Sequence, residues 1–352
     1  MKGTRINELD LLRLFAALAV VLFHYSFRGY AADAMSIMSY PLLASASKYG
    51  YLGVELFFMI SGFVILMTAA NGSLRGFVIS RIVRLYPAFW ACCTITFLAT
   101  IAIGKPRYSA SIGQYLFNMT MLSGFLGIPS IDGAYWSLFV ELRFYALIAI
   151  ILVIGRIHQA QAFIFLWLVV SVALEIQPIG KLRYLLITDY SAFFIAGATY
   201  FLIWSKGLSQ TRVAIVTISW WLAMFQSIKG LRGFEAHYST KMNGYIVAGI
   251  ITTFFLVMML ASLRRTGLVG RSRWLLAGVL TYPLYLLHQN IGFMVFNIAY
   301  PTVNTHFLFW STIVAVLVSA YAVHLFVERR LSLQMRVGLN NIADRIQCLG
   351  RR

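Results

Sequence analysis

An arginine and a histidine lie inside the first apolar run of the chain, in the stretch RLFAALAVVLFH from Arg13 to His24. Ten residues separate them, and none of the ten is charged. A cation at the centre of a bilayer costs on the order of 2.5 kcal/mol or more, so such a residue indicates a partner, a water-filled cavity or a function. On a helix, positions eleven apart are offset by about 20° and roughly 16 Å along the axis, which puts both side chains on one face. The alternative is that Arg13 snorkels to the head groups while His24 bonds to a neighbouring helix.

A carboxylate occurs at a similar depth in a second apolar segment, AYWSLFVELRFY (residues 134–145). Glu141 lies about two helical turns into this segment, whereas Arg143 points in another direction and does not simply neutralise it. An unpaired buried carboxylate is costly. We therefore expect His24 or an arginine as the partner of Glu141.

Other polar residues interrupt the apolar segments GYLGVELFFMISGF (50–63) and TYPLYLLHQN (281–290). Glu55 lies near the outer end of the first of these segments, where its carboxylate could face a pore. Helix packing is the simpler explanation for Ser61, and a packed hydrogen-bonding role is an equal alternative for His288. We expect the following residues to bind substrate or line a pore: Glu55, Ser61, Trp136, Tyr282 and His288.

Two arginines three residues apart, Arg81 and Arg84, precede Pro87 in the stretch RIVRLYP. They share one helix face at the end of an apolar run. Two guanidinium groups on one face suit a polyphosphate, because each can donate paired hydrogen bonds to phosphate oxygens. The alternative is that they only anchor the helix at the cytosolic surface of the membrane.

The composition identifies the class of protein that must position these residues. Of the 352 residues, 60% are hydrophobic and only 11% are charged, compared with about 25% charged residues in soluble domains. This indicates an integral membrane protein. The net charge of +18 is concentrated in short loops, which is typical of cytoplasmic loops rather than of nucleic-acid binding. The three cysteines, Cys92, Cys93 and Cys348, suggest no disulfide framework.

About 20 apolar residues are needed to span a bilayer. The sequence predicts an all-α polytopic protein with about ten spans: 10–29, 51–70, 86–104, 134–154, 162–176, 188–204, 212–228, 243–262, 275–298 and 306–327.

The distribution of basic residues predicts the orientation of these spans. With both termini in the cytoplasm, 18 Lys and Arg residues lie on the inner side and 9 on the outer side, as the positive-inside rule favours. The loop 263–274 is then cytosolic and the loop 299–305 lies outside. Segment 111–130 is apolar but broken by Gly and Pro, so we expect it to lie at the outer interface or to re-enter the membrane.

The N-terminal segment has one competing interpretation, a cleaved signal peptide, because Ala32-Asp33-Ala34 has the form of a cleavage site. Glu8, Asp10 and His24 do not fit that pattern, and we expect a retained first helix. We expect one transmembrane domain, residues 1–331, followed by a short basic cytoplasmic tail, residues 332–352.

In order along the chain, these motifs resemble the acyltransferase-3 family of membrane acyltransferases. The resemblance rests on Leu9-Asp10-x-Leu12-Arg13, His24, GVELFFMISGF, RIVRLYP, WSLFVELRFY, YPLYLLH and VERRL, and covers residues 9 to about 331. Two positions depart from the family pattern: Glu55 stands where aspartate is common, and Arg330 stands where proline often follows the Glu-Arg pair.

The resemblance implies an O-acyltransferase, with acetyl as the expected group, that acylates sugars of bacterial envelope polysaccharides in the inner membrane. It implies acyl-CoA as donor, a glycan or glycolipid as acceptor, surrounding membrane lipids, and neither a metal nor a nucleic acid. His24 and Glu141 would be catalytic, and Arg13, Arg81 and Arg84 would bind the CoA phosphates.

The chemical role of His24 has two alternatives. A desolvated imidazole favours its neutral form, which a general base requires, but a transient acyl-histidine is the other possibility. At the level of the whole protein, a transporter or flippase of a lipid-linked sugar and a non-catalytic scaffold are the rival functions.

Overall fold

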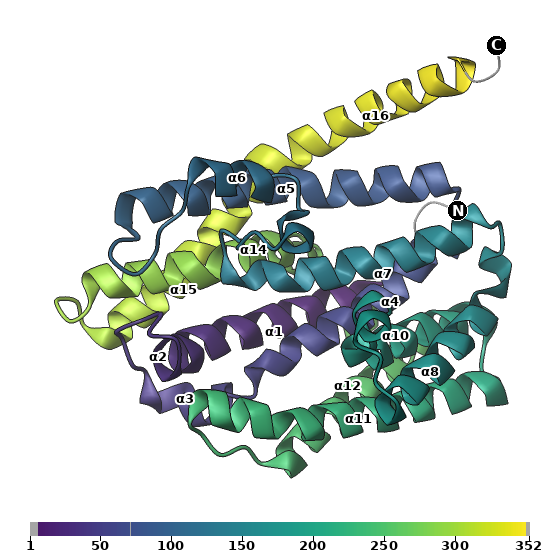
Figure 1. Cartoon of the computed structure of the whole chain (residues 1–352), viewed down its shortest axis with the longest axis horizontal. Helices are drawn as coiled ribbons and strands as arrows, with labels where there is room; N and C mark the ends of the chain where they lie inside the picture. The colour runs from purple at the N-terminus through teal and green to yellow at the C-terminus, as the bar shows by residue number, and fades with distance from the viewer. Residues whose placement is uncertain (1–5, 71, 350–352) are drawn as a thin grey trace. The chain divides into compact units, whose positions relative to one another are not determined.

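The structure is a computed structural model that describes residues 6–70 and 72–349, and these residues form helices and loops without strands. The all-α prediction is therefore confirmed. Figure 1 shows how the helices follow one another along the chain. The chain divides into two compact units, each built from separate segments: unit 1 comprises Met1–Ala34, Ser39–Ala70 and Val140–Gly278, and unit 2 comprises Met35–Met38, Asn71–Phe139 and Val279–Arg352.

Nine helical segments of the described residues are long and apolar enough to cross a membrane. They correspond to nine of the ten predicted spans, and the protein is accordingly a multi-pass membrane protein. The segments are Asn7–Ala31, Gly50–Ala70, Leu74–Ile103, Gly133–Val153, Ile157–Ile176, Gly180–Lys206, Gln210–Tyr238, Gly244–Ser262 and Thr305–Cys348.

The remaining predicted span, 275–298, is the helix α14 (Leu275–Ala299), which has 25 residues. Its length suffices to cross a bilayer of about 30 Å. It contains the polar sequence His288-Gln289-Asn290, which lowers the hydropathy of the helix around its centre. Pro283 also lies inside this helix.

Unit 1 contains the elements that carry His24 and Glu141. Helix α7 begins in unit 2 and continues into unit 1 from Val140. The helices of unit 1 are α1 (Asn7–Phe23), the π-helical turn η1 (His24–Arg28), α2 (Gly29–Ala31), α3 (Pro41–Ser47), the 3₁₀ turn η2 (Gly50–Leu52), α4 (Gly53–Ala70), α7 (Trp136–Val153), α8 (Ala160–Ile176), α9 (Gly180–Leu185), α10 (Thr188–Lys206), α11 (Gln210–Tyr238), α12 (Gly244–Ser262) and α13 (Leu268–Arg271).

Helix α10 forms the core of unit 1, since nearly every residue from its start to Ile203 is buried. It packs against α4 through two glycines. A Cβ atom on Gly62 would collide with the carbonyl oxygen of Phe194, and one on Gly197 would collide with that of Met59. Small residues let transmembrane helices approach closely. In the segment that contains Ser61, this close packing occurs at the neighbouring residue Gly62.

Helix α1 approaches the start of α4 in the same way. Cβ atoms on Gly50 and Gly53 would collide with the backbone carbonyl oxygens of Ala19 and Ala16. Only glycine permits these contacts, so the C-terminal half of α1, which leads to His24, is held directly against η2 and α4.

Unit 2 consists of long helices and one irregular segment. Its elements are α5 (Leu74–Ile103), α6 (Ile112–Asn118), the 3₁₀ turns η3 (Ser123–Leu126) and η4 (Gly133–Tyr135), the first turn of α7, most of α14, α15 (Thr305–Val323), the π-helical turn η6 (His324–Glu328) and α16 (Arg329–Leu349).

Two helices of unit 2 differ from the predicted boundaries. Helix α5 begins at Leu74, capped by the Ser73 hydroxyl, which accepts a hydrogen bond from the Gly76 N–H. It therefore starts well before the predicted boundary at residue 86 and includes both arginines of RIVRLYP. Helix α16 begins at Arg329 and runs through the predicted domain boundary at residue 332. The division into a domain and a tail stays a prediction.

The segment 111–130 does not form a spanning helix. Its longest helix, α6, has 7 residues, about 10 Å, and begins with a capping box formed by Ser111 and Gln114. The side chain of Gln114 also donates to the carbonyl oxygen of Pro129, which folds the segment back on itself. Whether it lies at the outer interface stays a prediction.

Within each unit, contacts between helix ends agree with the prediction that successive spans cross the membrane in opposite directions. The start of α1 lies beside α13, because Asn7 donates to the carbonyl oxygen of Gly270 and Thr266 donates to Glu8. In unit 2, Arg75 near the start of α5 forms a 2.6 Å ion pair with Asp344 in α16.

The sidedness of these ends relative to the membrane stays a prediction. Four of the basic residues on which it depends lie outside the described residues, namely Lys2, Arg5, Arg351 and Arg352.

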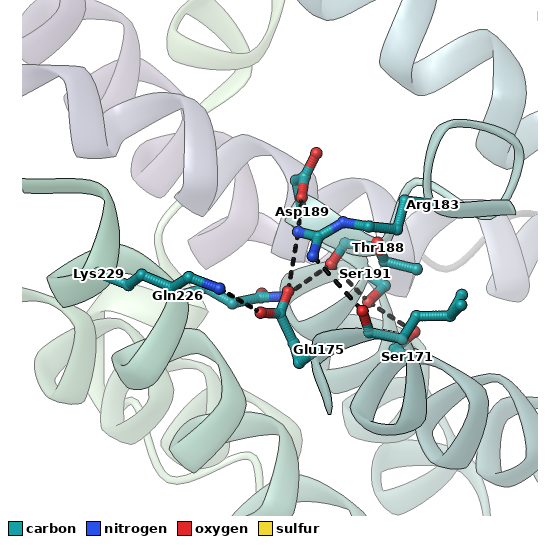
Figure 2. A network of polar contacts seen from close by, with 9 residues as sticks. Ser171, Glu175, Arg183, Thr188, Asp189, Ser191, Gln226 and Lys229 are labelled. Carbon is teal, nitrogen blue, oxygen red and sulfur yellow. Dashed lines mark hydrogen bonds and ion pairs between the residues drawn. The ribbon is translucent and has the colours of Figure 1, made fainter. Parts of the chain in front are cut away.

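A charged network joins four helices of unit 1, α8, α9, α10 and α11. Figure 2 shows the Glu175 carboxylate of α8 between Arg183, at 2.9 Å, and Lys229, at 3.1 Å. Gln226 of α11 donates to the same carboxylate at 2.9 Å, and Arg183 also pairs with Asp189 of α10. The Glu175 side chain is nearly buried, so the network ties the end of α8 and the start of α10 to α9 and to the interior of α11.

The substitution Glu175→Gln should lower the stability of the protein. It removes the charge that orders three donors, and hydrogen bonds to charged groups contribute about 1.5–3 kcal/mol. The matched control is Lys229→Met, because the Lys229 side chain is 58% exposed and exposed ion pairs contribute about 0.2–1 kcal/mol. Thermal unfolding of both purified variants in the same detergent is the measurement. Equal destabilisation by the two substitutions would contradict the central position of Glu175.

Candidate active site

His24 is the first residue of the π-helical turn η1, which interrupts the first membrane-spanning helix. Single π-helical turns within α-helices occur frequently at functional sites. The side chain is buried, with 6% of its surface exposed, and its ring packs edge-on against Phe23 with the centroids 5.2 Å apart. Arg13 lies on the same continuous helix, as predicted, and forms an ion pair with Asp10 at 3.8 Å.

Two hydrogen bonds determine the tautomer of His24. Its Nδ1 lies 2.8 Å from the carbonyl oxygen of Val20, and its Nε2 lies 3.1 Å from Nη1 of Arg28. A carbonyl oxygen can only accept a hydrogen bond and a guanidinium can only donate one. The proton of the neutral imidazole therefore resides on Nδ1, and the lone pair of Nε2 faces Arg28.

Arg28 is a site residue that the sequence analysis missed. It closes the same π-helical turn four residues after His24, and the charge distribution counts it only as one of the nine basic residues on the outer side. The spacing of four from His24 could have indicated it, because residues i and i+4 are neighbours on a helix. The side chain of Arg28 also interacts with the Tyr238 hydroxyl at the end of α11.

Aromatic side chains enclose this part of unit 1. The rings of Phe27 and Phe234 are stacked, with an interplanar angle of 7° and centroids 6.2 Å apart. Tyr51 packs on Phe234 at 4.8 Å, and Tyr238 packs on Phe27 at 5.3 Å. These rings also contact Phe23, whose ring packs against His24, so His24 lies beside an aromatic cluster built from η1, η2 and α11.

Glu141 and Ser61 meet across two helices of unit 1. The Ser61 hydroxyl of α4 donates a 2.6 Å hydrogen bond to Oε1 of Glu141 in α7. Within the part of the chain that the structure describes, this is the hydrogen bond that Glu141 receives, and none joins it to His24. The partner of Glu141 is thus different from the one we expected, and the two ring nitrogens of His24 contact the Val20 carbonyl and Arg28 instead. A role of Glu141 in the reaction stays a prediction.

Glu55 lies in the first turn of α4, close to Tyr51 and Tyr190. Its Oε2 atom is buried and has no hydrogen-bond partner among the described residues. Buried polar atoms without a partner are uncommon in folded proteins and call for an explanation. Glu55 therefore remains a candidate for contact with a substrate.

The paired arginines lie in unit 2 on α5. Arg81 donates to the neighbouring Ser80 hydroxyl at 2.9 Å. Arg84 lies 3.7 Å from Oε1 of Glu328 and above the ring of Tyr282, with 5.8 Å between its guanidinium carbon and the ring centroid. The Arg84 side chain is 42% exposed, so part of its guanidinium is accessible to a further anion.

Glu328 is the second residue that the sequence analysis left without a role. It closes the π-helical turn η6, and its other oxygen lies 2.7 Å from Nδ1 of His324, the first residue of that turn. Glu328 therefore serves as the resident counter-ion of Arg84. An ion pair between segments so distant in the sequence leaves no local signal.

Three other predicted site residues also lie in unit 2. Trp136 is the first residue of α7 and is partly exposed. The Tyr282 hydroxyl donates to the carbonyl oxygen of Leu85 at 3.3 Å. His288 is fully buried, and its Nδ1 lies 2.8 Å from the carbonyl oxygen of Tyr285. The geometry of His288 agrees with the packed alternative, whereas substrate contact by Trp136 and Tyr282 stays a prediction.

The comparison with protein families identifies the chain. The model of the acyltransferase domain of the acyltransferase-3 family matches residues 6–326. The chain belongs to this family, as its motifs predicted, and is a membrane acyltransferase.

Two curated proteins are similar to the chain. Nodulation protein 10 of Rhizobium leguminosarum bv. viciae is 28% identical over 319 residues, which cover 81% of this chain and 82% of that protein. The putative peptidoglycan O-acetyltransferase YrhL of Bacillus subtilis (strain 168) is 26% identical over 169 residues, which cover 43% of this chain and 24% of that protein. No solved structure matches the chain.

A double-mutant cycle tests whether Ser61 and Glu141 act together. We expect Glu141→Gln to lose most of the acyltransferase activity, because the amide keeps the shape of the carboxylate but not its charge. Ser61→Ala should lose less, and the double variant should be no worse than Glu141→Gln alone, since Ser61 acts through Glu141. The measurement is the rate of acyl transfer by variants matched for membrane insertion. Additive losses would contradict the coupling, and normal turnover by Glu141→Gln would reduce Glu141 to a packing residue.

Proposed function

We propose that this membrane acyltransferase is an O-acyltransferase of the bacterial inner membrane. It transfers an acyl group, with acetyl as the expected group, from cytosolic acyl-CoA to a hydroxyl of an extracytoplasmic or lipid-linked glycan. The observation that carries the proposal is the state of His24, a buried neutral imidazole whose Nδ1–H is directed to the Val20 carbonyl.

His24 is the general base of the proposed reaction. A base must hold a free or exchangeable lone pair within hydrogen-bond reach of the proton that it removes. The Val20 carbonyl fixes the ring orientation and keeps the proton on Nδ1, which leaves Nε2 to accept the proton of the acceptor hydroxyl. In proteins with a catalytic triad, a carboxylate has this orienting role. Here a backbone carbonyl supplies the acceptor without adding a charge.

Arg13, Arg81 and Arg84 are the proposed ligands of the CoA phosphates. The accessible part of the Arg84 guanidinium is compatible with this role, because a guanidinium carries five N–H donors and the ion pair with Glu328, at 3.7 Å, occupies it only in part. A phosphate would add charge-assisted hydrogen bonds at the remaining donors. Each of the three arginines belongs to a segment whose cytosolic position is predicted by the charge distribution.

The glycan acceptor is supported by the similarity to a protein named as a putative peptidoglycan O-acetyltransferase. We therefore propose a surface polysaccharide or its lipid-linked precursor as the class of acceptor. The rival function is transport or flipping of a lipid-linked sugar. Purified protein in lipid vesicles distinguishes the two, because only the enzyme transfers label from radioactive acetyl-CoA to an added glycan acceptor.

His24→Ala should abolish acylation while leaving expression in the membrane intact. General-base catalysis contributes about 10²–10⁴-fold, so the residual rate should fall at least a hundred-fold. The control is His158→Ala, which removes an exposed histidine from the short 3₁₀ turn Ile157–Gln159 and should leave the rate unchanged. The measurement is transfer of labelled acetyl groups by equal amounts of inserted protein. Substantial activity of His24→Ala protein would exclude the proposed base.

Arg81→Lys and Arg84→Lys should weaken binding of acyl-CoA. Lysine keeps the charge but loses the paired N–H donors, and each lost charge-assisted hydrogen bond contributes about 1.5–3 kcal/mol, or roughly ten-fold or more in affinity. Arg13→Lys should behave in the same way if Arg13 reaches the donor.

The control is Arg156→Lys, because Arg156 is exposed in a loop and anchoring to the membrane surface requires only its charge. Direct binding of acetyl-CoA to the purified proteins at one ionic strength is the measurement. Unchanged affinity in all three variants would return these arginines to an anchoring role.

A further inference from the structure

Arg28 occupies the lone pair of His24 on which the proposed reaction depends. Its Nη1 lies 3.1 Å from Nε2, and an imidazole nitrogen has a single lone pair in the plane of the ring. The guanidinium and an acceptor hydroxyl therefore cannot both donate to Nε2. The contact seen in the structure is a resting arrangement that the acceptor must replace.

We propose that Arg28 is a catalytic residue that yields Nε2 to the acceptor hydroxyl and then stabilises the oxyanion formed from the thioester carbonyl. This inference rests on the proposed function of His24 as general base. It assigns the oxyanion donor that acyl transfer requires to a residue with no role in the motifs of the sequence analysis.

The position of Arg28 carries the proposal. A hydroxyl bound to Nε2 lies about 2.7–3.0 Å from that nitrogen, which is close to the position that Nη1 of Arg28 occupies at 3.1 Å. The carbonyl carbon under attack bonds to this hydroxyl oxygen, so its own oxygen lies one bond further out. If the Arg28 guanidinium moves by about the width of one atom, it therefore stays beside this carbonyl oxygen.

The surroundings of Arg28 limit how far it can move. Arg28 closes a helical turn that begins with His24, and it interacts with the Tyr238 hydroxyl of α11. Phe27 and Tyr238 pack together at 5.3 Å. These contacts favour a small rotation of the guanidinium over its complete withdrawal into water. Its five N–H donors allow it to keep one partner while it gains another.

The proposed step balances in protons and bonds. The acceptor O–H bond breaks, its proton passes to Nε2 of His24, and the oxygen forms a bond to the thioester carbonyl carbon. The carbonyl π electrons move to the oxygen, where Arg28 donates. When the oxyanion collapses, the carbon–sulfur bond breaks, the thiolate leaves, and it takes the proton from Nε2. His24 returns to its neutral form, and Arg28 can bind Nε2 again.

The first experiment measures the His24–Arg28 hydrogen bond without any substrate. Protein labelled with ¹⁵N in the rings of its six histidines is compared with His24→Gln protein, which identifies the His24 resonances by their loss. In the wild-type protein, Nδ1 should carry the proton and Nε2 should show the shift of an unprotonated nitrogen that accepts a hydrogen bond. In Arg28→Gln protein, the Nε2 resonance should move toward the position of a nitrogen that accepts a weaker hydrogen bond or none. An unchanged resonance would overturn the proposal.

The second experiment measures acetyl transfer by Arg28→Gln and Arg28→Lys proteins. Loss of one oxyanion donor costs about 10²–10³-fold in kcat in enzymes with comparable chemistry, so the glutamine variant should lose this much with little change in the KM for the donor. Lysine keeps the charge, so Arg28→Lys protein should retain part of the rate. This variant also provides the test if Arg28→Gln protein does not fold. The matched control is Arg232→Gln, an exposed arginine of α11, which should retain the wild-type kcat.

The outcomes separate this inference from the proposed function. Activity in His24→Ala protein would overturn the role of His24 as general base and, with it, the role of Arg28 that depends on it. Loss of activity in His24→Ala but a normal kcat in Arg28→Gln would overturn the role of Arg28 alone. A raised donor KM with an unchanged kcat would likewise overturn it, because Arg28 would then only bind the donor.

Discussion

A polar group within a bilayer must find its partner inside the protein, because the hydrocarbon offers none. The site in unit 1 follows from this constraint. His24 is satisfied by a backbone carbonyl of its own helix and by the last residue of the same π-helical turn. Glu141 is satisfied by a hydroxyl from a second helix. Each of these partners also restricts the chemistry available, since it determines which atoms carry protons and which lone pairs stay open to a substrate.

The π-helical turns show one way in which this constraint is met within a single helix. The widened turn η1 begins with His24 and ends with Arg28, and the turn η6 begins with His324 and ends with Glu328. In both, a histidine and a charged side chain four residues later are in direct contact. The first pair contains His24, the proposed proton acceptor. The second pair contains Glu328, the counter-ion of Arg84, which is proposed to bind the donor.

The glycine contacts of α4 explain why the site can be held so closely. Gly50 and Gly53 bring α4 against α1, and Gly62 brings it against α10. Helices that meet through their backbones cannot slide without a steric clash, so the depth of His24 relative to Ser61 is determined by packing rather than by loops. The charged network around Glu175 has the corresponding role where the end of α8 and the start of α10 meet α9 and α11.

The sequence by itself determined the class, the number of long apolar segments and the placement of Arg13 and His24 on one helix. These features depend on composition and on periodicity within one segment, which are local properties. It also determined the family, because motifs in a fixed order survive in the primary structure. Only the tertiary structure decided that Ser61 is the partner of Glu141, which lies 80 residues away, and that Glu328 is the counter-ion of Arg84. Such pairs depend on which helices pack together and at what depth, and no local spacing records that. Arg28 lies only four residues from His24, yet its role became visible only when the structure showed which nitrogen of the imidazole it faces.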